Sequence, residues 1–452
     1  MRRSVALSER GWRMSEQSIL VLGAGPAGAA TALGLRRLGY PVTVVSDWRR
    51  FAAVEGVSPR VLEGLRHAGL GAALAQTTTP AERQVHWNGE QLRLNQEFLL
   101  DRQRFDQALR DDLHRVGVTL IEGRVREVLL EAGPQVRLDD GQVLYADFLV
   151  EARGRQAPLA NGRVRGPETV SLLNGWQAAP GLPASAVESL DDGWAWMARL
   201  ADGRCYWQVT LDAATAELPG KAALADHCAE RRRRSALVAQ LFDEQALLPA
   251  SVHARSSTAI LAGDCCGKDW LRVGDAAMAV DPLSGNGIFQ SLSSALQAPV
   301  VINTLLQCPE RAELARRFHQ SRIEQLFMRF ARIGRDFHAQ ERSRADAPFW
   351  ARRSAWPDTQ PIHVPANWDS VRVEHRPVLR DALVEEAQVV VTADQPLGIW
   401  HLQGIELAPV VRAVKAGQGM DNCLVAYSEQ QRSMLKRWLA EQGLGIAVDH
   451  AP

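Results

Sequence analysis

Cysteine is scarce in this sequence, and none of the six cysteines stands in a CxxC pair. Zinc sites and iron–sulfur clusters need closely spaced cysteines, and small secreted proteins need a dense set of them. We therefore expect no bound metal and a reducing compartment, the cytoplasm.

Net charge is also absent, because 52 Lys and Arg residues balance 52 Asp and Glu residues. No overall field then attracts nucleic acid or an anionic membrane, and neither is expected as a partner. The one long apolar run, residues 19–35, is broken by four glycines and a proline, so neither a membrane span nor a signal peptide is predicted. Residues 1–13, which precede Met14, are expected to be a disordered leader.

A glycine-rich motif, GAGPAG at residues 23–28, follows the apolar run 18–22 and precedes an alanine-rich segment that reaches Leu38. A second apolar run at residues 41–45 completes the pattern strand, tight turn, helix, strand. This pattern is typical of a dinucleotide-binding βαβ unit. A glycine-rich turn that binds no ligand is the alternative.

A pyrophosphate can bind the N–H groups and the positive dipole end of a helix N-terminus if the backbone approaches closely. In this motif the first glycine permits the turn, the second leaves room for the phosphates, and the third lets helix and strand pack. The predicted cofactor contacts are Gly23, Gly25, Pro26, Ala27 and Gly28. The acid that usually binds the ribose is replaced by Ser46, with Asp47 next to it, so either residue is a candidate.

A second pair of motifs, VGDAA at residues 273–277 and DPLSGNGI at residues 281–288, follows far downstream. A carboxylate at a strand end can bind a ribityl hydroxyl, and a helix start can stabilise the charge that develops at the flavin edge on reduction. A loop and a plain helix start are the alternatives. The cofactor contacts predicted here are Asp275, Pro282, Gly285, Asn286, Gly287 and Ile288, and Val125 is expected to contact the cofactor as well.

The wider pattern predicts an α/β chain, α+β overall, with a discontinuous FAD domain and a mostly antiparallel sheet domain. Helices are expected at residues 58–74 and 102–116, two strands at 118–138, and long helices from 287 to about 340. The predicted domains are 14–80, 100–160 and 259–345 for FAD, 81–99 and 161–258 for the substrate-side sheet, and 361–452 for a small C-terminal α+β domain.

These motifs, with Asp101-Arg102, Phe105-Asp106 and the segment 147–154, resemble the flavin-dependent monooxygenases of the tryptophan-halogenase-like branch. The resemblance covers residues 17–355 and implies a glutathione-reductase-like Rossmann FAD domain. It also implies that Arg102 lies along the FAD. Arg153-Gly154 replaces the usual Asp-Gly, which weakens that match.

The halogenases of this branch place a lysine from their first hundred residues between flavin and substrate. The four lysines here are Lys221, Lys268, Lys415 and Lys436, so the sequence lacks that lysine. The pair Trp194 and Trp196 matches only the start of the halogenase WxWxIP motif, and core packing explains it equally well. Oxygen transfer is therefore favoured over halogenation.

Residues 337–353 and the extra C-terminal domain look like the LodB-like flavoproteins of quinone-cofactor biogenesis. This resemblance implies hydroxylation or dihydroxylation of a tryptophan side chain in a protein substrate, the small subunit of an amine dehydrogenase, on the way to cysteine tryptophylquinone. It implies that NADH or NADPH reduces the FAD, that O₂ forms a C4a-hydroperoxyflavin, and that the indole ring attacks it.

Catalytic roles are assigned by location only. Pro282 and Leu283 are expected to form the wall beside C4a, and Glu55, His86 and His253 are candidates for the base that takes the ring proton. For the three bases, a structural role is the stronger alternative.

Three other functions stay open at this point: a hydroxylase of a free small aromatic, an FAD-dependent reductase of the geranylgeranyl-reductase type, and a non-catalytic FAD-binding chaperone.

Overall fold

The computed structural model describes residues 16–49, 51–158, 162–242, 250–285 and 287–445, so the expected leader lies outside the described residues. Contacts divide the chain into two compact units. The larger unit comprises residues 1–299 and 326–358, and the smaller one comprises 300–325 and 359–452. The finer division into three domains stays a prediction.

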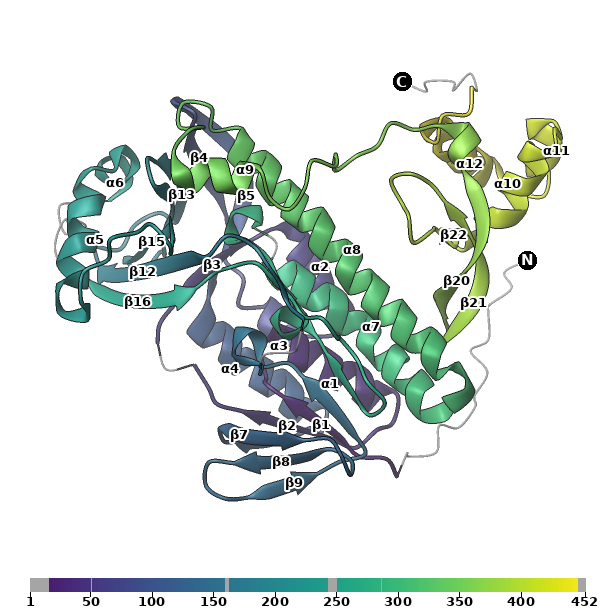
Figure 1. The fold of residues 1–452 in the computed structure, drawn as a ribbon, viewed down its shortest axis with the longest axis horizontal. Helices are drawn as coiled ribbons and strands as arrows, with labels where there is room; N and C mark the ends of the chain where they lie inside the picture. Colours follow the sequence, from purple (N-terminus) through teal and green to yellow (C-terminus); the bar gives the residue numbers. More distant parts are fainter. Residues whose placement is uncertain (1–15, 50, 159–161, 243–249, 286, 446–452) are drawn as a thin grey trace. The chain divides into compact units, whose positions relative to one another are not determined.

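A five-stranded parallel sheet organises part of the larger unit (Figure 1). Its strand order is β18 (Trp270–Arg272), β10 (Phe148–Glu151), β1 (Ile19–Leu22), β2 (Val42–Ser46) and β6 (Thr119–Glu122). Helix α1 (Pro26–Arg37) joins β1 to β2, which lie parallel in register. The predicted βαβ unit is confirmed, and its glycine-rich turn lies at the carboxyl end of β1, where parallel sheets bind ligands.

Both faces of the parallel sheet are covered. Val136 and Leu138 of a three-stranded sheet pack with Leu20 and Leu22 of β1 on one face. That sheet comprises β7 (Val125–Leu129), β8 (Gln135–Leu138) and β9 (Val143–Tyr145). Residues 118–138 therefore contain three strands, β6, β7 and β8, where two were predicted, because a turn with Gly133 at φ 96° separates β7 from β8.

Helices α4 (Arg102–Arg115) and α7 (Gly287–Gln307) pack with α1. The approach of α1 to α7 requires a glycine, because a Cβ atom at Gly34 would overlap the Pro299 ring. The helix predicted at 58–74 is split into α2 (Pro59–Ala68) and α3 (Gly71–Leu74) by Gly69, which has a φ of 78° that ends a helix readily.

An eight-stranded, mostly antiparallel sheet forms the other part of the larger unit. Its order is β16 (Ser251–Ser256), β12 (Thr169–Gln177), β15 (Arg204–Asp212), β14 (Gly193–Arg199), β13 (Ala184–Leu190), β4 (Pro80–Trp87), β5 (Glu90–Asp101) and β3 (Val54–Val57). A small sheet is built from β11 (Val164–Arg165), β17 (Ile260–Leu261) and β19 (Met278–Ala279). The predicted α/β class with an interleaved antiparallel sheet is confirmed.

Two helices that the sequence analysis did not predict, α5 (Leu224–Arg233) and α6 (Ala236–Leu241), lie within the antiparallel segment. Cys228, Leu237 and Val238 from these helices share a buried cluster with Met197 and Trp207 of the sheet. One face of the eight-stranded sheet is therefore closed by α5 and α6, and side chains that alternate with Met197 and Trp207 point to the opposite face.

The smaller unit joins residues 300–325, from the end of α7 and the start of α8 (Ala312–Ala339), to the tail. The side chain of Asn303 donates to the carbonyl of Ala382 at 2.8 Å, and Val384 N–H donates to Thr304 Oγ1 at 2.8 Å. The tail elements are β20 (Arg372–Arg380), β21 (Leu383–Val391), β22 (His401–Leu402), β23 (Ile405–Glu406), α10 (Leu407–Lys415), α11 (Met420–Leu424) and α12 (Glu429–Glu441). Among the described helices, none is long and apolar enough to cross a membrane.

Helix α9 (Pro348–Ser354) is tied to the eight-stranded sheet by a buried ion pair. Arg353 Nη1 lies 3.0 Å from Asp212 Oδ2, with side chains 2% and 1% exposed. Asp212→Asn should lower the free energy of unfolding by about 3 kcal/mol, because it leaves the Arg353 charge buried without its counterion. Chemical denaturation followed by tryptophan fluorescence measures this.

The matched control is Asp191→Asn. Asp191 pairs with Arg344 at 2.8 Å, but its side chain is 95% exposed, so the loss should be within about 1 kcal/mol. Equal losses for the two variants would contradict the assignment of the Asp212 pair as a buried tie.

Candidate active site

The turn after β1 can be built only with glycine at two of its positions. Gly23 has a φ of 103°, and a Cβ atom there would lie 2.5 Å from the carbonyl oxygen of Ala152 at the end of β10. A Cβ atom at Gly28 would overlap the carbonyl oxygen of Gly23. The backbone of α1 is thereby brought close to the ends of β1 and β10.

The N-terminus of α1 is open to a ligand. Gly25 is the N-cap residue, no side chain caps the helix, and its first turn contains no acidic residue. A Cβ atom at Gly25 would find no other atom within 4 Å among the residues that the structure describes. The first N–H groups of a twelve-residue helix therefore face space that an anion can fill.

The second motif packs directly on the first. Gly274 has a φ of 59°, and a Cβ atom there would lie 2.7 Å from Cβ of Ala27 in α1. Its N–H donates to Ser294 Oγ in α7 at 2.8 Å. Two motifs that are distant in the sequence are thus held at one place by the close approach of α1, α7 and residue 274.

Asp275 follows Gly274 and carries the carboxylate expected to bind a hydroxyl. Its Oδ1 accepts from Ser291 Oγ at 3.2 Å, and its Oδ2 lies 3.6 Å from Arg155 Nε. Burial raises the pKa of Asp275, whereas Arg155 opposes the rise. The side chain is still 35% exposed, so a ligand can reach it.

The segment 281–288 forms a short 3-10 turn and then starts α7. The Asp281 carboxylate accepts from Leu283 N–H at 2.9 Å, Gly285 has a φ of 62°, and Ile288 is buried. The helix begins at Gly287, as predicted, while Asn286 lies outside the described residues. The contact of Pro282 and Leu283 with a flavin stays a prediction.

Leu283 belongs to an apolar group on the face of the eight-stranded sheet that α5 and α6 leave uncovered. We name this group the tryptophan cluster; its members are Trp87, Val187, Trp194, Trp196, Leu283, Ala347, Phe349 and Trp350. Trp87 and Trp350 meet edge to face, with ring centroids 5.2 Å apart. The predicted core role of Trp194 and Trp196 fits this packing, and the cluster places Leu283 beside an aromatic surface.

Arg102 lies buried between two carboxylates. Its guanidinium nitrogens lie 2.5 Å from Glu55 Oε1 and 2.8 Å from Asp106 Oδ1. Burial alone would raise the pKa of Glu55, but Arg102, Arg49 and Arg255 outweigh burial and lower it. A carboxylate with a lowered pKa is a weak base, which disfavours Glu55 as the acceptor of a ring proton.

The predicted ribose contacts, Ser46 and Asp47, lie at the end of β2. Ser46 Oγ accepts from Ala24 N–H at 3.3 Å, which ties the end of β2 to the glycine-rich turn. Asp47 lines a cavity of about 500 Å³ together with Glu122, Gly123, Arg124 and Asp139. Val125 follows Arg124 at the start of β7. Binding by Ser46, Asp47 and Val125 stays a prediction.

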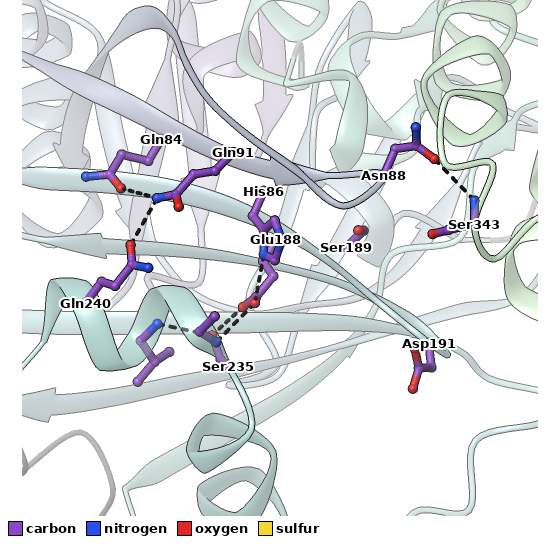
Figure 2. Close-up of polar contacts among 12 residues, drawn as sticks. Gln84, His86, Asn88, Gln91, Glu188, Ser189, Asp191, Ser235, Gln240 and Ser343 are labelled. Atoms are coloured by element: carbon purple, nitrogen blue, oxygen red, sulfur yellow. Dashed lines mark hydrogen bonds and ion pairs between the residues drawn. The ribbon is translucent and has the colours of Figure 1, made fainter.

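His86 lies on the face of the sheet that α6 covers (Figure 2). Its Nδ1 lies 3.5 Å from Glu188 Oε1, and the Glu188 carboxylate accepts from Ser235 Oγ and from Ala236 N–H at the start of α6. Since side chains alternate along β4, Trp87 enters the tryptophan cluster and His86 points to the other face. This placement disfavours His86 as a base near Leu283.

Asn88, at the turn after β4, bonds to the segment after α8. Its Oδ1 accepts from the N–H groups of Arg342 and Ser343 at 2.9 and 3.2 Å (Figure 2). The turn between β4 and β5, next to Trp87 of the tryptophan cluster, is thereby fixed to residues that precede α9.

His253 is exposed on the edge strand β16 and stacks on Phe51, with ring centroids 4.7 Å apart. Arg49 and Arg255 also lie against the Phe51 ring. His253 therefore borders the charged group around Glu55. A catalytic role for it stays a prediction.

An open helix N-terminus, a half-buried carboxylate and a second helix start beside aromatic side chains lie in one part of the larger unit, and this arrangement fits the predicted flavin dinucleotide site. No group of three or more His, Cys, Asp or Glu within the described part of the chain is arranged to hold a metal.

Comparison with known proteins gives the family. The tryptophan halogenase family model matches residues 63–364, and the chain belongs to this family. A solved structure of a peptidyl tryptophan dihydroxylase, QhpG, essential for tryptophylquinone cofactor biogenesis, is 75% identical, with a TM-score of 0.87 over 95% of this chain and 100% of that chain.

Two more distant relatives are a tryptophan 2-halogenase of Chondromyces crocatus and the flavin-dependent halogenase CmlS. The first is 24% identical over 369 residues, which is 74% of this chain and 70% of the relative. CmlS is 15% identical, with a TM-score of 0.74 over 96% of each chain, and it supports the fold alone. The predicted halogenase-like fold with a Rossmann-type FAD domain is confirmed, and FAD is the cofactor of this family.

Proposed function

We propose that the chain is an FAD-dependent monooxygenase that dihydroxylates a tryptophan side chain of a protein substrate during tryptophylquinone biogenesis. The observation that carries this proposal is the 75% identity, over 95% of the chain, to a peptidyl tryptophan dihydroxylase. The convergence of the two motifs at Ala27 and Gly274 supports it independently, because it provides a site for both ends of one flavin.

In this proposal, the N–H groups at the start of α1 bind the pyrophosphate, and Asp275 binds a ribityl hydroxyl. The start of α7, after Gly285, faces the flavin edge at which negative charge grows on reduction. FAD supplies the activation of O₂, and NADH or NADPH supplies two electrons for each oxygen atom that is added. Arg102, held between Glu55 and Asp106, lies along the FAD in this proposal.

The tryptophan cluster has two tasks in this mechanism. Leu283, Trp194 and Trp350 form a wall that keeps water from the reacting atoms. Trp350 is itself fixed, because its Nε1 donates to the carbonyl of Leu190 at 3.0 Å. The half-buried rings of Trp87 and Trp196, in contrast to the buried Trp194 and Trp350, can offer stacking and edge contacts to an incoming indole ring.

Halogenation is disfavoured for this chain. A steering lysine would have to lie beside the tryptophan cluster, but Lys221 and Lys268, the two lysines of the larger unit, are exposed and belong to neither motif. A tryptophan in a protein, presented by a small subunit of an amine dehydrogenase in the cytoplasm, is the proposed substrate.

The test is mass spectrometry of a tryptophan-containing amine dehydrogenase subunit after incubation with the purified chain, FAD and NADH or NADPH under ¹⁸O₂. We expect one tryptophan to gain two oxygen atoms, both labelled, and no change when the nicotinamide is left out. A substrate that gains no oxygen would contradict the proposal.

The same reaction separates the alternatives. Hydroxylation of free tryptophan but not of the subunit would indicate a small-molecule hydroxylase. Oxidation of the nicotinamide without consumption of O₂ would indicate a reductase. FAD that is bound but never reduced would indicate a chaperone.

A further inference from the structure

Glu97 is a buried carboxylic acid that none of the motifs includes. It lies on β5 and is 7% exposed. The residue opposite to it on β4 is Ala81, whose small side chain leaves room above the sheet. The carboxyl group therefore reaches over β4 to the strands β13 and β14.

Two donors converge on one oxygen of Glu97. Ser185 Oγ and Trp196 Nε1 both donate to Oε1, the latter at 3.2 Å. Oε2 lies on the side of β3, where a Cβ atom at Gly56 would overlap it. Among the described residues, no group donates a hydrogen bond to Oε2. One oxygen thus fixes the side chain, and the other is left to accept a proton.

Glu97 lies beside the tryptophan cluster and close to β3, the strand that carries Glu55. Gly56 is the neighbour of Glu55, which pairs with Arg102. Trp196, on the other side, packs in the tryptophan cluster with Leu283 and also against the cluster that contains Val54 and Leu99. The carboxyl group is therefore one hydrogen bond away from the tryptophan cluster.

Glu97, Ser185 and Trp196 lie on one face of the sheet, whereas Glu55, which is paired with Leu100, points to the other face. Ser185 and Val187 alternate with Ala186 and Glu188 on β13; Val187 lies in the tryptophan cluster, while Ala186 lies in the core under α5 and α6. Glu97, bonded to Ser185, is therefore on the same face as the tryptophan cluster.

We infer that Glu97 is the base that takes the proton from the indole ring during hydroxylation. In each hydroxylation, an oxygen atom from O₂ forms a bond to a ring carbon. The C–H bond at that carbon then breaks, its electron pair returns to the ring, and the proton moves to Glu97 Oε2. The other oxygen atom leaves as water with the two electrons supplied by the nicotinamide. This inference rests on the proposed function.

The surroundings make Glu97 a stronger base than an ordinary glutamate. Burial raises the pKa of Glu97, while the charge of Arg83 on β4 and the bond from Trp196 oppose the rise without cancelling it. Among the described residues, Arg83 is the charged side chain whose interaction shifts the pKa of Glu97. A general base works best when its pKa approaches the working pH.

The test is Glu97→Gln, which can still accept from Ser185 and Trp196 but cannot take a proton. We expect the rate of tryptophan hydroxylation to fall roughly 100-fold or more, within the range that a general base contributes. Substrate deuterated on the indole ring should show a larger isotope effect in this variant than in the wild type, since proton removal becomes the slow step. Glu97→Asp should recover part of the rate.

The matched control is Glu188→Gln. Glu188 is as buried, at 4%, and also accepts from a serine, but it lies on the opposite face of the same sheet. Its rate and isotope effect should equal those of the wild type. A Glu97→Gln variant with the wild-type rate and isotope effect would overturn the inference, as would an equal loss of rate in both variants.

A second readout does not depend on activity. Because the folded state holds the Glu97 proton more tightly than the unfolded state, this group contributes stability below the pKa of an unfolded glutamate, and that contribution is lost as pH rises through the folded pKa. The unfolding free energy of Glu97→Gln, relative to the wild type, should therefore increase as pH rises through this range. A difference that is flat with pH would contradict the raised pKa.

These experiments distinguish a failure of the proposed function from a failure of the role inferred for Glu97. If the wild type itself adds no oxygen to the protein substrate, the proposed function fails. If the wild type hydroxylates and Glu97→Gln does so equally well, only the role of Glu97 fails.

Discussion

Gly25→Ala is expected to weaken FAD binding about 10- to 100-fold while leaving the fold intact, because one lost hydrogen bond to a charged group costs about 1.5–3 kcal/mol. The new methyl group would meet no other atom within 4 Å, and the φ of −68° at Gly25 suits alanine. It would, however, occupy the space in which the pyrophosphate approaches the start of α1. Titration of the FAD-free protein with FAD, followed by flavin fluorescence, measures the change.

The matched control is Gly71→Ala at the start of α3. Gly71 also begins a helix and also has no atom near the position of a Cβ, but it lies outside the motifs. Both variants should unfold at the wild-type denaturant concentration, and only Gly25→Ala should lose FAD. Unchanged FAD affinity in Gly25→Ala would show that the start of α1 does not bind the pyrophosphate.

The second prediction concerns the contact between the two motifs. Gly274→Ala should both destabilise the protein and weaken FAD binding, since its Cβ would lie 2.7 Å from Cβ of Ala27 at a φ of 59°. Overpacking costs about 1–3 kcal/mol and a left-handed alanine about 1–2 kcal/mol more. Denaturation and FAD titration are both measured.

A double variant isolates the steric part of this loss. Gly274→Ala combined with Ala27→Gly removes the overlap but keeps the backbone strain, so stability should be partly restored. Gly141→Ala serves as the control for strain alone, because Gly141 has a φ of 90° with open space around it. The unfolding free energy of the single variant Ala27→Gly completes the cycle. If the double variant loses as much unfolding free energy as Gly274→Ala and Ala27→Gly lose together, the two motifs do not touch as described.

Much of the dinucleotide half of the fold follows from the sequence. The apolar runs on either side of GAGPAG specify two strands and a helix through local periodicity, and the need for glycine at position 28 is local too, because a Cβ atom there would overlap the carbonyl oxygen of Gly23. The start of α7 at Gly287 is similarly local. Such features need no knowledge of distant contacts.

The parts that the sequence could not predict depend on distant contacts. Helices α5 and α6 are short, so their apolar residues give only a weak helical pattern in the sequence. Packing against Met197 and Trp207 stabilises them. His86 was a reasonable base by residue type, but its strand turns it toward Glu188. Conversely, no sequence motif includes Glu97. Its hydrogen-bond donors lie on β13 and β14, which are distant from it in the sequence.

The smaller unit illustrates the same limit. Residues 300–325 comprise the end of α7 and the start of α8, and the break at Pro309 between the two helices does not indicate a change of partner. The bonds of Asn303 and Thr304 to the hairpin of β20 and β21 place them with the tail. Their amides and hydroxyls gave no signal in the sequence, because polar residues are common on helix surfaces.

The central claim is that one FAD molecule is held at one end by the start of α1 and at the other by residues 275–288. The crystal structure of the chain grown with FAD tests this most directly. We predict pyrophosphate oxygens within hydrogen-bond distance of the first N–H groups of α1, a ribityl hydroxyl on Asp275, and the flavin ring against Leu283. A flavin that contacts only one of the two motifs, or crystals that take up no FAD at saturating concentration, would contradict it.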